Sequence, residues 1–265
     1  MSTKGTALIT GASSGIGATY ADRLAKRGYD LLLVARDKDR LDKLAAELRD
    51  KTGVNVEVLK ADLTIKADVT VVAERLRHDA SITLLLNNAG IAANGSLAEA
   101  NLDEADRLVQ LNIVALTHLA SAAAASFVKN GRGTIVNVAS VVAMLPERFN
   151  AVYTASKAYV LSLTQSLHAE IGEKGVHVQA VLPGATRTEI WERAGIDLNA
   201  FPPEMVMDVN ELVDAALAGL DQKELITIPS LSSAADWDAL VNARLALGPN
   251  LSLQHAAARY KTTGA

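Results

Sequence analysis

The 265-residue sequence predicts an α/β fold, in which a doubly wound parallel sheet carries helices on both faces. Short runs rich in Val, Ile and Leu lack polar alternation, as expected of strands that are buried on both sides. Amphipathic segments separate these runs: Leu163, Leu167 and Ile171, for example, repeat every four residues and share one helical face. Strands and helices that alternate in this way are typical of a parallel sheet with crossover helices.

The strand-like runs follow one another without a linker or an internal repeat. They span residues 6–10, 31–35, 54–60, 83–86, 134–139 and 176–182. Gly28 and Gly53 stand where helices are expected to end. Beyond residue 183 the pattern loosens, and it predicts a helix over 210–220, a strand over 225–228 and a helix over 234–247.

We expect one domain over residues 1–265, in which residues 208–265 form a variable C-terminal part. Residues 185–207 contain Gly195, Pro202 and Pro203 and show little periodicity. Such an insertion beside a regular sheet is expected to act as a substrate lid. The alternative is a solvated connection between two elements.

Composition and charge exclude several classes of protein. With 49% hydrophobic and 21% charged residues the chain is globular, and without cysteine it has no disulfide, no thiolate zinc site and no thiol nucleophile. The net charge of −4, without a basic cluster, argues against nucleic acid as a partner. The five histidines lack metal-ligand spacing, so we expect no metal. No signal peptide or apolar run of membrane-spanning length is evident, which predicts a cytoplasmic protein without a membrane partner.

A glycine-rich turn follows the first predicted strand and opens the first helix. Glycines allow the tight turn and a close approach of backbone N–H groups, and the helix start offers unpaired donors to a pyrophosphate. A turn that only connects two elements is the alternative, but the strand before it and the helix after it fit a Rossmann-type dinucleotide site. The expected cofactor contacts in this turn are Gly11, Ser13, Ser14, Gly15, Ile16 and Gly17.

The end of the second strand distinguishes NADP from NAD. An NAD site places a carboxylate there for the ribose 2′-hydroxyl, whereas this chain has Arg36, whose planar fork suits a 2′-phosphate. NADP is therefore the expected cofactor, although Arg36 is also compatible with a solvated loop cation. At the end of the third strand stand Asp62 and Leu63. Asp62 suits an adenine amino group and a helix cap equally well.

Tyr153 and Lys157 are four residues apart at the start of a long predicted helix, so they share one face. An ammonium about 4 Å from the phenol would lower its pKa by roughly three units, from about 10 toward neutrality. A tyrosine with such a pKa serves as an acid and as a base. Taken alone, the pair is equally compatible with a surface tyrosine and a solvated lysine.

The pair belongs to an ordered set of motifs that covers about residues 3–190. The set comprises Thr10 to Gly17, Asn87-Asn88-Ala89-Gly90, Asn112, Ser140, Tyr153 with Lys157, and Pro183-Gly184. This set resembles the short-chain dehydrogenase/reductase superfamily in its short single-domain branch. The C-terminal quarter of the chain matches that family only loosely.

The resemblance implies a role for each matching residue. Tyr153 would be the general acid in reduction, Lys157 would lower its pKa and bind the nicotinamide ribose, and Ser140 would donate to the substrate oxygen. Asn112 would hold a water of a proton relay. The implied contacts with the cofactor are Asn88, Ala89, Gly90, Tyr153, Lys157, Pro183, Gly184, Thr186 and Thr188.

The expected function is an NADP(H)-dependent oxidoreductase that interconverts a ketone or aldehyde and its alcohol. The alternative is a catalytically silent NADP-binding sensor, but such a protein usually lacks the tyrosine or the lysine. Use of both NAD and NADP stays open, because Ser14 stands where some NADP-binding relatives carry a second basic residue. Apolar residues near 141–148 and in 185–207 favour an apolar or aromatic carbonyl substrate, and related enzymes are commonly homotetramers or homodimers.

Overall fold

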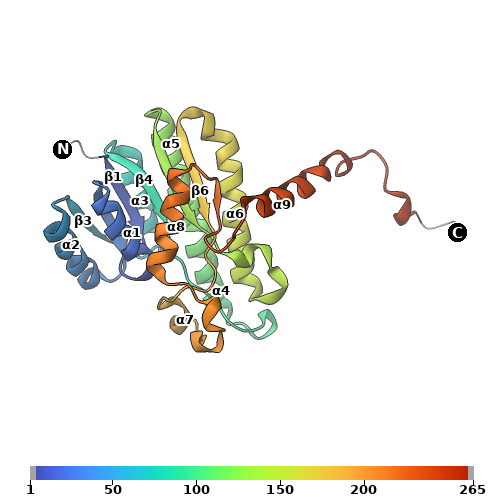
Figure 1. Ribbon diagram of the computed structural model, residues 1–265, viewed down its shortest axis with the longest axis horizontal. Helices are drawn as coiled ribbons and strands as arrows, with labels where there is room; N and C mark the ends of the chain where they lie inside the picture. Colours follow the sequence, from blue (N-terminus) through green and yellow to red (C-terminus); the bar gives the residue numbers. More distant parts are fainter. Residues whose placement is uncertain (1–3, 262–265) are drawn as a thin grey trace. The chain divides into compact units, whose positions relative to one another are not determined.

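A computed structural model describes residues 4–261 and contains one seven-stranded sheet (Figure 1). The strands are β1 (Thr6–Thr10), β2 (Asp30–Ala35), β3 (Val56–Lys60), β4 (Ile82–Asn87), β5 (Gly133–Val138), β6 (Val176–Val181) and β7 (Ile226–Thr227). Their order is β3-β2-β1-β4-β5-β6-β7, and all neighbours run parallel. The predicted doubly wound fold is confirmed. All carboxyl ends therefore meet at one edge, and the strand order reverses between β1 and β4.

Helices cover both faces of this sheet. They are α1 (Gly15–Lys26), α2 (Lys38–Thr52), α3 (Lys66–His78), α4 (Leu102–Val109), α5 (Leu116–Lys129), α6 (Ala151–Ile171), α7 (Ile190–Arg193), α8 (Val209–Asp221) and α9 (Ala234–Ala246). Residues of α1, α2 and α8 share one core cluster with the sheet, and residues of α3, α5 and α6 share another. Strands β1 to β6 contribute to both clusters by alternation: in β1, Ala7 and Ile9 face the first, and Leu8 faces the second.

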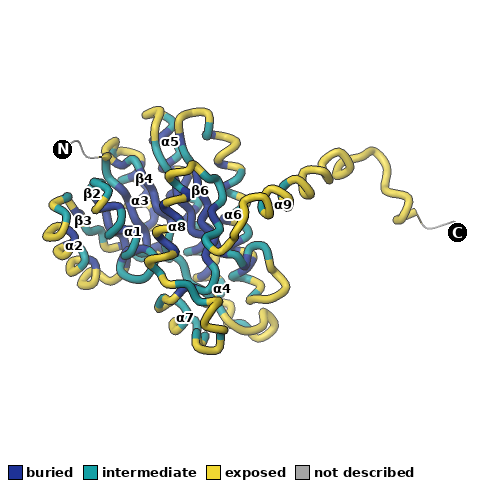
Figure 2. Tube along the Cα trace, in the orientation of Figure 1, coloured by how far each residue is buried: buried dark blue, intermediate teal, exposed yellow. Residues whose placement is uncertain are grey.

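Burial follows this layered arrangement (Figure 2). Leu8, Ile9 and Leu33 are fully buried, as expected of central strands covered on both sides. The sequence shows this burial as uninterrupted apolar runs, and for that reason it predicted the strands to within one or two residues at most ends.

One helical run, Leu102–Lys129, is long and apolar enough to span a membrane by length and composition alone, with a mean hydropathy of 1.6. The expectation that no segment reaches such a length is corrected. The run contains α4, a turn of π-helix at Gln110–Ala115, and α5, and half of its most apolar window is buried. Leu119, Ala123 and Phe127 lie in the core cluster with α3, so this run is a core helix of the fold.

The described residues fall into two compact units, one that ends at Pro229 and one that begins at Ser230. The second unit contains α9 and two short 3-10 turns, and none of its described residues is buried. Leu245, Leu251 and Leu253 are each more than half exposed there. The single domain expected over residues 1–265 stays a prediction.

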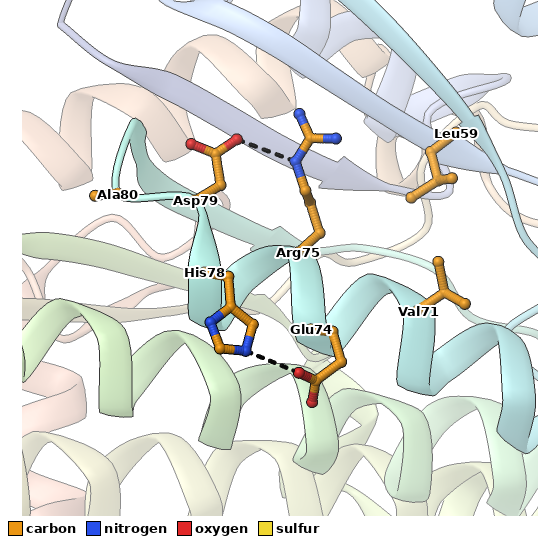
Figure 3. Close-up of a pocket in the computed structure, with 7 residues that line it drawn as sticks. All are labelled: Leu59, Val71, Glu74, Arg75, His78, Asp79 and Ala80. Carbon is orange, nitrogen blue, oxygen red and sulfur yellow. Dashed lines mark hydrogen bonds and ion pairs between the residues drawn. The ribbon is translucent and has the colours of Figure 1, made fainter.

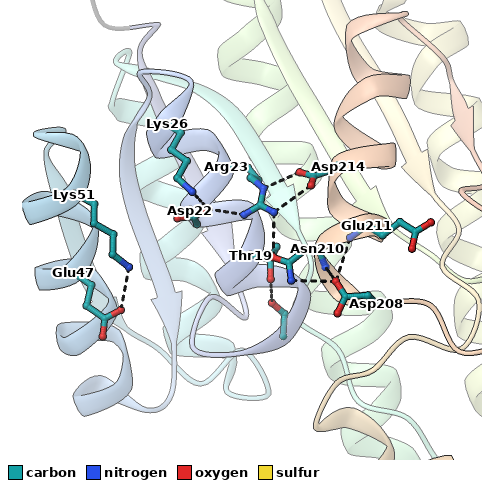
Figure 4. Close-up of polar contacts among 11 residues, drawn as sticks. Thr19, Asp22, Arg23, Lys26, Glu47, Lys51, Asp208, Asn210, Glu211 and Asp214 are labelled. Carbon is teal, nitrogen blue, oxygen red and sulfur yellow. Dashed lines mark hydrogen bonds and ion pairs between the residues drawn. The ribbon is translucent and has the colours of Figure 1, made fainter.

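Ion pairs join α1 to α8, which are far apart in the sequence (Figure 4). Arg23 donates from Nε to Asp214 Oδ1 over 2.7 Å and from Nη2 to Asp214 Oδ2 over 3.2 Å. Arg27 is bidentate to Asp221 at 2.8 and 2.9 Å. Asp208 caps α8 by accepting from the backbone N–H of Asn210. These contacts fix the helix that follows residues 185–207 against the helix that begins at the glycine-rich turn.

A buried polar chain crosses the middle of the sheet. Asn87 at the end of β4 donates to Asn137 Oδ1 in β5 over 3.0 Å, and Asn137 donates to Thr164 Oγ1 in α6 over 3.0 Å. Asn137 and Thr164 are fully buried. Buried amides are tolerated only when they are paired, so this chain links the end of β4 to α6 specifically.

Replacing Asn137 with Ala should lower the free energy of unfolding by about 1–3 kcal/mol, because it leaves the buried amide of Asn87 without its partner and leaves Thr164 Oγ1 only its bond to Val160 O. Urea unfolding followed by circular dichroism measures this loss. Asn55→Ala, which removes an exposed amide, should change stability by less than about 0.5 kcal/mol. A loss for Asn137→Ala no larger than that of the control would contradict a structural role for the chain.

Candidate active site

The glycine-rich turn after β1 is shaped so that side chains would block it. Gly11 and Gly15 have φ of +65° and +53°, the left-handed region that favours glycine. A side-chain carbon at Gly17 would collide with the carbonyl of Gly11 and would lie 2.6 Å from Asn88 Nδ2. Ser14 is the N-cap of α1, and its side chain makes no capping hydrogen bond in the described structure. The first turn of α1 thus presents backbone donors, which suit the phosphates of a dinucleotide.

The ends of β1 and β4 are joined directly beneath this turn. Thr10 Oγ1 accepts hydrogen bonds from the N–H groups of Asn88 and Ala89, both at 3.0 Å, and donates to Leu86 O. Asn88 Nδ2 donates to the carbonyls of Thr10 and Gly11 at 3.0 and 3.2 Å. These bonds hold the two loops together at the point where the strand order reverses.

The residues expected to contact the adenosine half lie at the ends of β2 and β3. Arg36 directly follows β2 and is exposed. Burial would raise the pKa of the nearby Asp62 carboxyl, but hydrogen bonds from Thr64 and the charges of Arg36 and Arg107 outweigh burial and lower it. Asp62 Oδ1 accepts from Thr64 N and Oγ1 in the turn before α3. The side chain of Leu63 is buried in the core with α3, so only its backbone is available to a ligand.

Ser140 follows β5 and meets residues from two other elements. Its hydroxyl donates to Pro183 O over 3.2 Å, directly after β6, and accepts from Val142 N. The Ser140 side chain also acts on Tyr153, whose pKa it lowers. Tyr153 lies in the first turn of α6, where Asn150 caps the helix by accepting from Tyr153 N over 3.0 Å. The structure thus brings the predicted phenol and hydroxyl together.

Lys157 lies one helical turn further along α6 and is 7% exposed. Its Nζ donates to Val138 O at the end of β5 over 3.0 Å and lies 5.8 Å from the centre of the Tyr153 ring. A side-chain carbon at Gly90 would lie 3.7 Å from this Nζ and 3.3 Å from Asn112 Oδ1. The ammonium therefore lies between the ends of β4 and β5.

The pKa expected for Tyr153 is wrong for this structure. Burial raises the pKa of Tyr153 to about 12, although the hydrogen bond with Ser140 lowers it. Burial also lowers the pKa of Lys157 to about 8. The ammonium lies against the tyrosine ring and bonds a backbone carbonyl, so desolvation outweighs the attraction that the spacing of four residues implied.

Asn112 lies in the π-helical turn between α4 and α5. Its Oδ1 accepts from Ile91 N over 3.0 Å, and its Nδ2 donates to Ile91 O and Ser156 Oγ over 2.9 and 3.1 Å. Such turns interrupt the helical hydrogen-bond ladder and are frequent at functional sites. The amide of Asn112 therefore clamps the loop after β4 to α6.

Residues 185–207 form a loop whose two ends pair with each other. Met207 N donates to Ala185 O over 2.9 Å, and Arg187 N donates to Met207 O over 3.0 Å. Inside the loop Trp191 Nε1 donates to Thr186 O over 2.7 Å, and the Trp191 and Phe201 rings lie 5.6 Å apart. Thr186 Oγ1 donates to Gly184 O. The Thr188 side chain lies beside Gly15, where an added carbon would be 3.2 Å away.

A family model described as short chain dehydrogenase matches residues 5–199 of this chain. The chain belongs to the short-chain dehydrogenase family. It is 57% identical to a short-chain dehydrogenase from Sphingobium yanoikuyae solved in complex with NADPH, with a TM-score of 0.94 over 97% of this chain and 100% of that one. It is also 52% identical to a bulky-bulky ketone specific alcohol dehydrogenase from Comamonas testosteroni, with a TM-score of 0.90 over 98% and 99% of the two chains.

A more distant relative is an uncharacterised oxidoreductase of Staphylococcus epidermidis, 31% identical over 84% of this chain and 93% of its own length. The short-chain dehydrogenase described here is thus an oxidoreductase whose cofactor is a nicotinamide dinucleotide. The glycine turn fits such a cofactor, because a side-chain carbon at Gly11 or Gly17 would collide with Asn88 or with the turn's own backbone, so only glycines allow the tight turn that leads into the start of α1.

Several residues of this dehydrogenase's site were not singled out from the sequence. Thr10 begins the glycine-rich motif and Ser156 lies between Tyr153 and Lys157, but the sequence assigned neither a role. Their hydroxyls join the loops that carry the predicted residues. The hydroxyl of Thr10 directly after a buried apolar run was a usable signal. The carbonyl of Val138, which binds Lys157, carries no sequence signal, because every residue has one.

A surface hollow of about 520 Å³ on the outer side of α3 shares no residue with this site (Figure 3). Its lining includes Arg75, which pairs with Glu57 and Asp79, and His78, which pairs with Glu74 over 3.0 Å. Within residues 4–261 no group of His, Asp and Glu has the arrangement of a metal site.

Replacing Lys157 with Met should alter the pH dependence of the apoprotein's stability. The pKa of about 8 in the folded state lies below the value of about 10.4 in the unfolded chain. Between these values the unfolded state binds more protons, so the wild type should gain stability relative to Lys157→Met as the pH rises from 8 to about 10.4. Chemical unfolding at several pH values measures this gain, and parallel curves for the two proteins would contradict the lowered pKa.

Proposed function

We propose that this dehydrogenase is an NADP(H)-dependent reductase of ketones or aldehydes, with Tyr153 as the general acid. The observation that supports this most directly is the meeting of Tyr153, Ser140 and Lys157 at the carboxyl ends of β5 and β6, beside the glycine turn. A phenol whose pKa is about 12 stays protonated at neutral pH, which suits a proton donor in the direction of reduction.

The chain's own residues supply the proton and stabilise the developing charge. When bound, the nicotinamide supplies the hydride that adds to the carbonyl carbon. The Ser140 hydroxyl turns from Pro183 O to donate its hydrogen bond to the carbonyl oxygen. The Tyr153 hydroxyl transfers its proton to that oxygen, which completes the alcohol. In the oxidation direction the Tyr153 phenolate accepts this proton back.

Lys157 and Asn112 support this step from behind Tyr153. The ammonium of Lys157 lies against the tyrosine ring, where its charge favours the phenolate that forms when the proton leaves. Lys157, which binds Val138 O, is also proposed to bind the nicotinamide ribose. The three hydrogen bonds of the Asn112 amide support a positioning role, and its part in holding a relay water stays a prediction.

NADP is the proposed cofactor, and Arg36 is the residue proposed to bind its 2′-phosphate. An exposed guanidinium follows β2 where an NAD-specific site would carry a carboxylate. The relative from Sphingobium yanoikuyae was solved in complex with NADPH, which supports this choice.

The proposed substrate is a ketone with apolar groups on both sides of the carbonyl. Leu145, Phe149 and Met205 are 41%, 41% and 61% exposed in the segments that follow Ser140 and Pro183. Exposed apolar side chains in those segments suit an apolar substrate. The relative from Comamonas testosteroni is described as specific for bulky-bulky ketones.

A role for residues 185–207 and an assembly state are also proposed. Residues 185–207 are proposed as the substrate lid, since they form a closed loop above the glycine turn. The exposed leucines after Ser230 and Leu102 at the start of α4 support a homodimer or homotetramer. A location in the cytoplasm stays a prediction. A silent sensor is the less favoured function, because the full set of Asn112, Ser140, Tyr153 and Lys157 is present.

Replacing Tyr153 with Phe should reduce kcat for ketone reduction by about 10²–10⁴-fold, because the proton donor is lost. NADPH affinity, measured by fluorescence titration, should stay near that of the wild type. Tyr159→Phe is a matched control on the same helix, since the Tyr159 hydroxyl bonds Thr117 instead. Turnover by Tyr153→Phe at the rate of this control would refute the assignment.

Replacing Arg36 with Asp should weaken NADPH binding by about 10–100-fold and leave NADH binding nearly unchanged, because only NADPH presents a 2′-phosphate to this side chain. Lys43→Asp makes the same charge reversal at an exposed position of α2 and should affect both cofactors little. Isothermal titration with both cofactors decides the matter, and equal losses would mean that Arg36 does not bind the 2′-phosphate.

A further inference from the structure

An ion pair fastens the loop of residues 185–207 to α2, on the far side of the glycine turn. Arg40 Nη1 donates to both carboxylate oxygens of Glu189, at 3.1 and 2.9 Å. Arg40 lies in the first turn of α2, four residues after Arg36, and Glu189 lies directly before α7. The pair therefore joins segments that are 149 residues apart.

The Arg40–Glu189 pair lies at the same edge of the sheet as the glycine turn. Thr188 lies against Gly15 at the start of α1, and the next residue, Glu189, reaches the start of α2. Residues 188–189 thus cross from the end of β1 to the end of β2, above the edge of the sheet where the glycine turn and Arg36 lie. A dinucleotide bound to the glycine turn would lie beneath residues 188–189.

Each partner of the ion pair keeps a second partner when the pair opens. Glu189 also pairs with Arg193 in its own loop, and Arg40 Nε lies 3.4 Å from Asp37 Oδ2. When the Arg40–Glu189 pair opens, each charge therefore keeps an opposite charge nearby, which keeps the barrier to opening low. The other end of the loop is held at the pairing of Met207 with Ala185 and Arg187. The helix that follows it, α8, is fixed to α1 by Arg23 (Figure 4) and also by Arg27.

We propose that the Arg40–Glu189 ion pair is a latch that retains the dinucleotide cofactor, so that the pair must open before the cofactor leaves. This inference rests on the proposed function, since it requires a dinucleotide in the glycine turn. Both residues are positioning residues that act on cofactor exchange, and neither takes part in proton transfer. Arg40 and Glu189 are 49% and 44% exposed, so the latch is sensitive to salt.

The test is the release rate of NADPH from its binary complex with Glu189→Gln, measured by stopped-flow fluorescence after mixing with excess NADP⁺. The latch predicts release about two- to fivefold faster than from the wild type, the effect expected for an exposed ion pair. The two rates should converge at high salt. NADH should show the same acceleration, because the latch does not depend on a 2′-phosphate.

Removing a negative charge near an anionic ligand slows release unless a latch is lost, so the sign of the change is decisive. Glu192→Gln removes the same charge from the same loop, where Glu192 makes no ion pair with any described residue, and it should release NADPH no faster than the wild type. Slower or unchanged release from Glu189→Gln would overturn the latch and leave the proposed function standing.

A second readout separates the latch from a general disturbance of the loop. If the pair acts as a unit, Arg40→Gln combined with Glu189→Gln should release NADH no faster than either single variant. Additive acceleration would overturn the latch. Failure of the wild type to bind either cofactor would overturn the latch and the proposed function together.

Discussion

The buried ammonium of Lys157 is the constraint around which the site is built. Removing a cation from water until it is 7% exposed costs free energy, and this burial lowers the pKa of Lys157 to about 8. The carbonyl of Val138 and the ring of Tyr153 offset this cost, and Gly90 lies beside the ammonium. These partners come from β5, α6 and the loop after β4, so the ammonium fixes the relative positions of three elements.

A parallel sheet makes this convergence achievable, because all carboxyl ends lie at one edge. The glycine turn, Asn88, Ser140 and Pro183 each follow a different strand, yet neighbouring strands bring them together. Polar bonds then hold the loops in place: Thr10 joins β1 to the loop after β4, and Asn112 joins that loop to α6. The edge thereby combines the glycine turn proposed to bind phosphates with the tyrosine proposed to donate a proton.

The sequence predicted the strands, the glycine turn and the order of the catalytic motifs, because these depend on local patterns of burial and on residues with special backbone freedom. It did not predict the π-helical turn at Asn112, the hydroxyl bonds of Thr10, or the Arg40–Glu189 pair, since these depend on tertiary contacts. The direction predicted for the pKa shift of Tyr153 was wrong for a related reason. Spacing along a helix gives the distance between two side chains, but burial depends on what packs around them.

In the proposed reaction, this edge of the sheet directs hydride to a carbonyl carbon while Tyr153 supplies the proton. The most direct measurement is the reduction of an aryl alkyl ketone with NADPH deuterated at C4 of the nicotinamide, separately in each epimer, followed by NMR of the alcohol. The account predicts that one epimer transfers its deuterium to the carbinol carbon and that the other transfers none. An alcohol without carbon-bound deuterium from either epimer, or NADPH binding without reduction of any ketone, would contradict it.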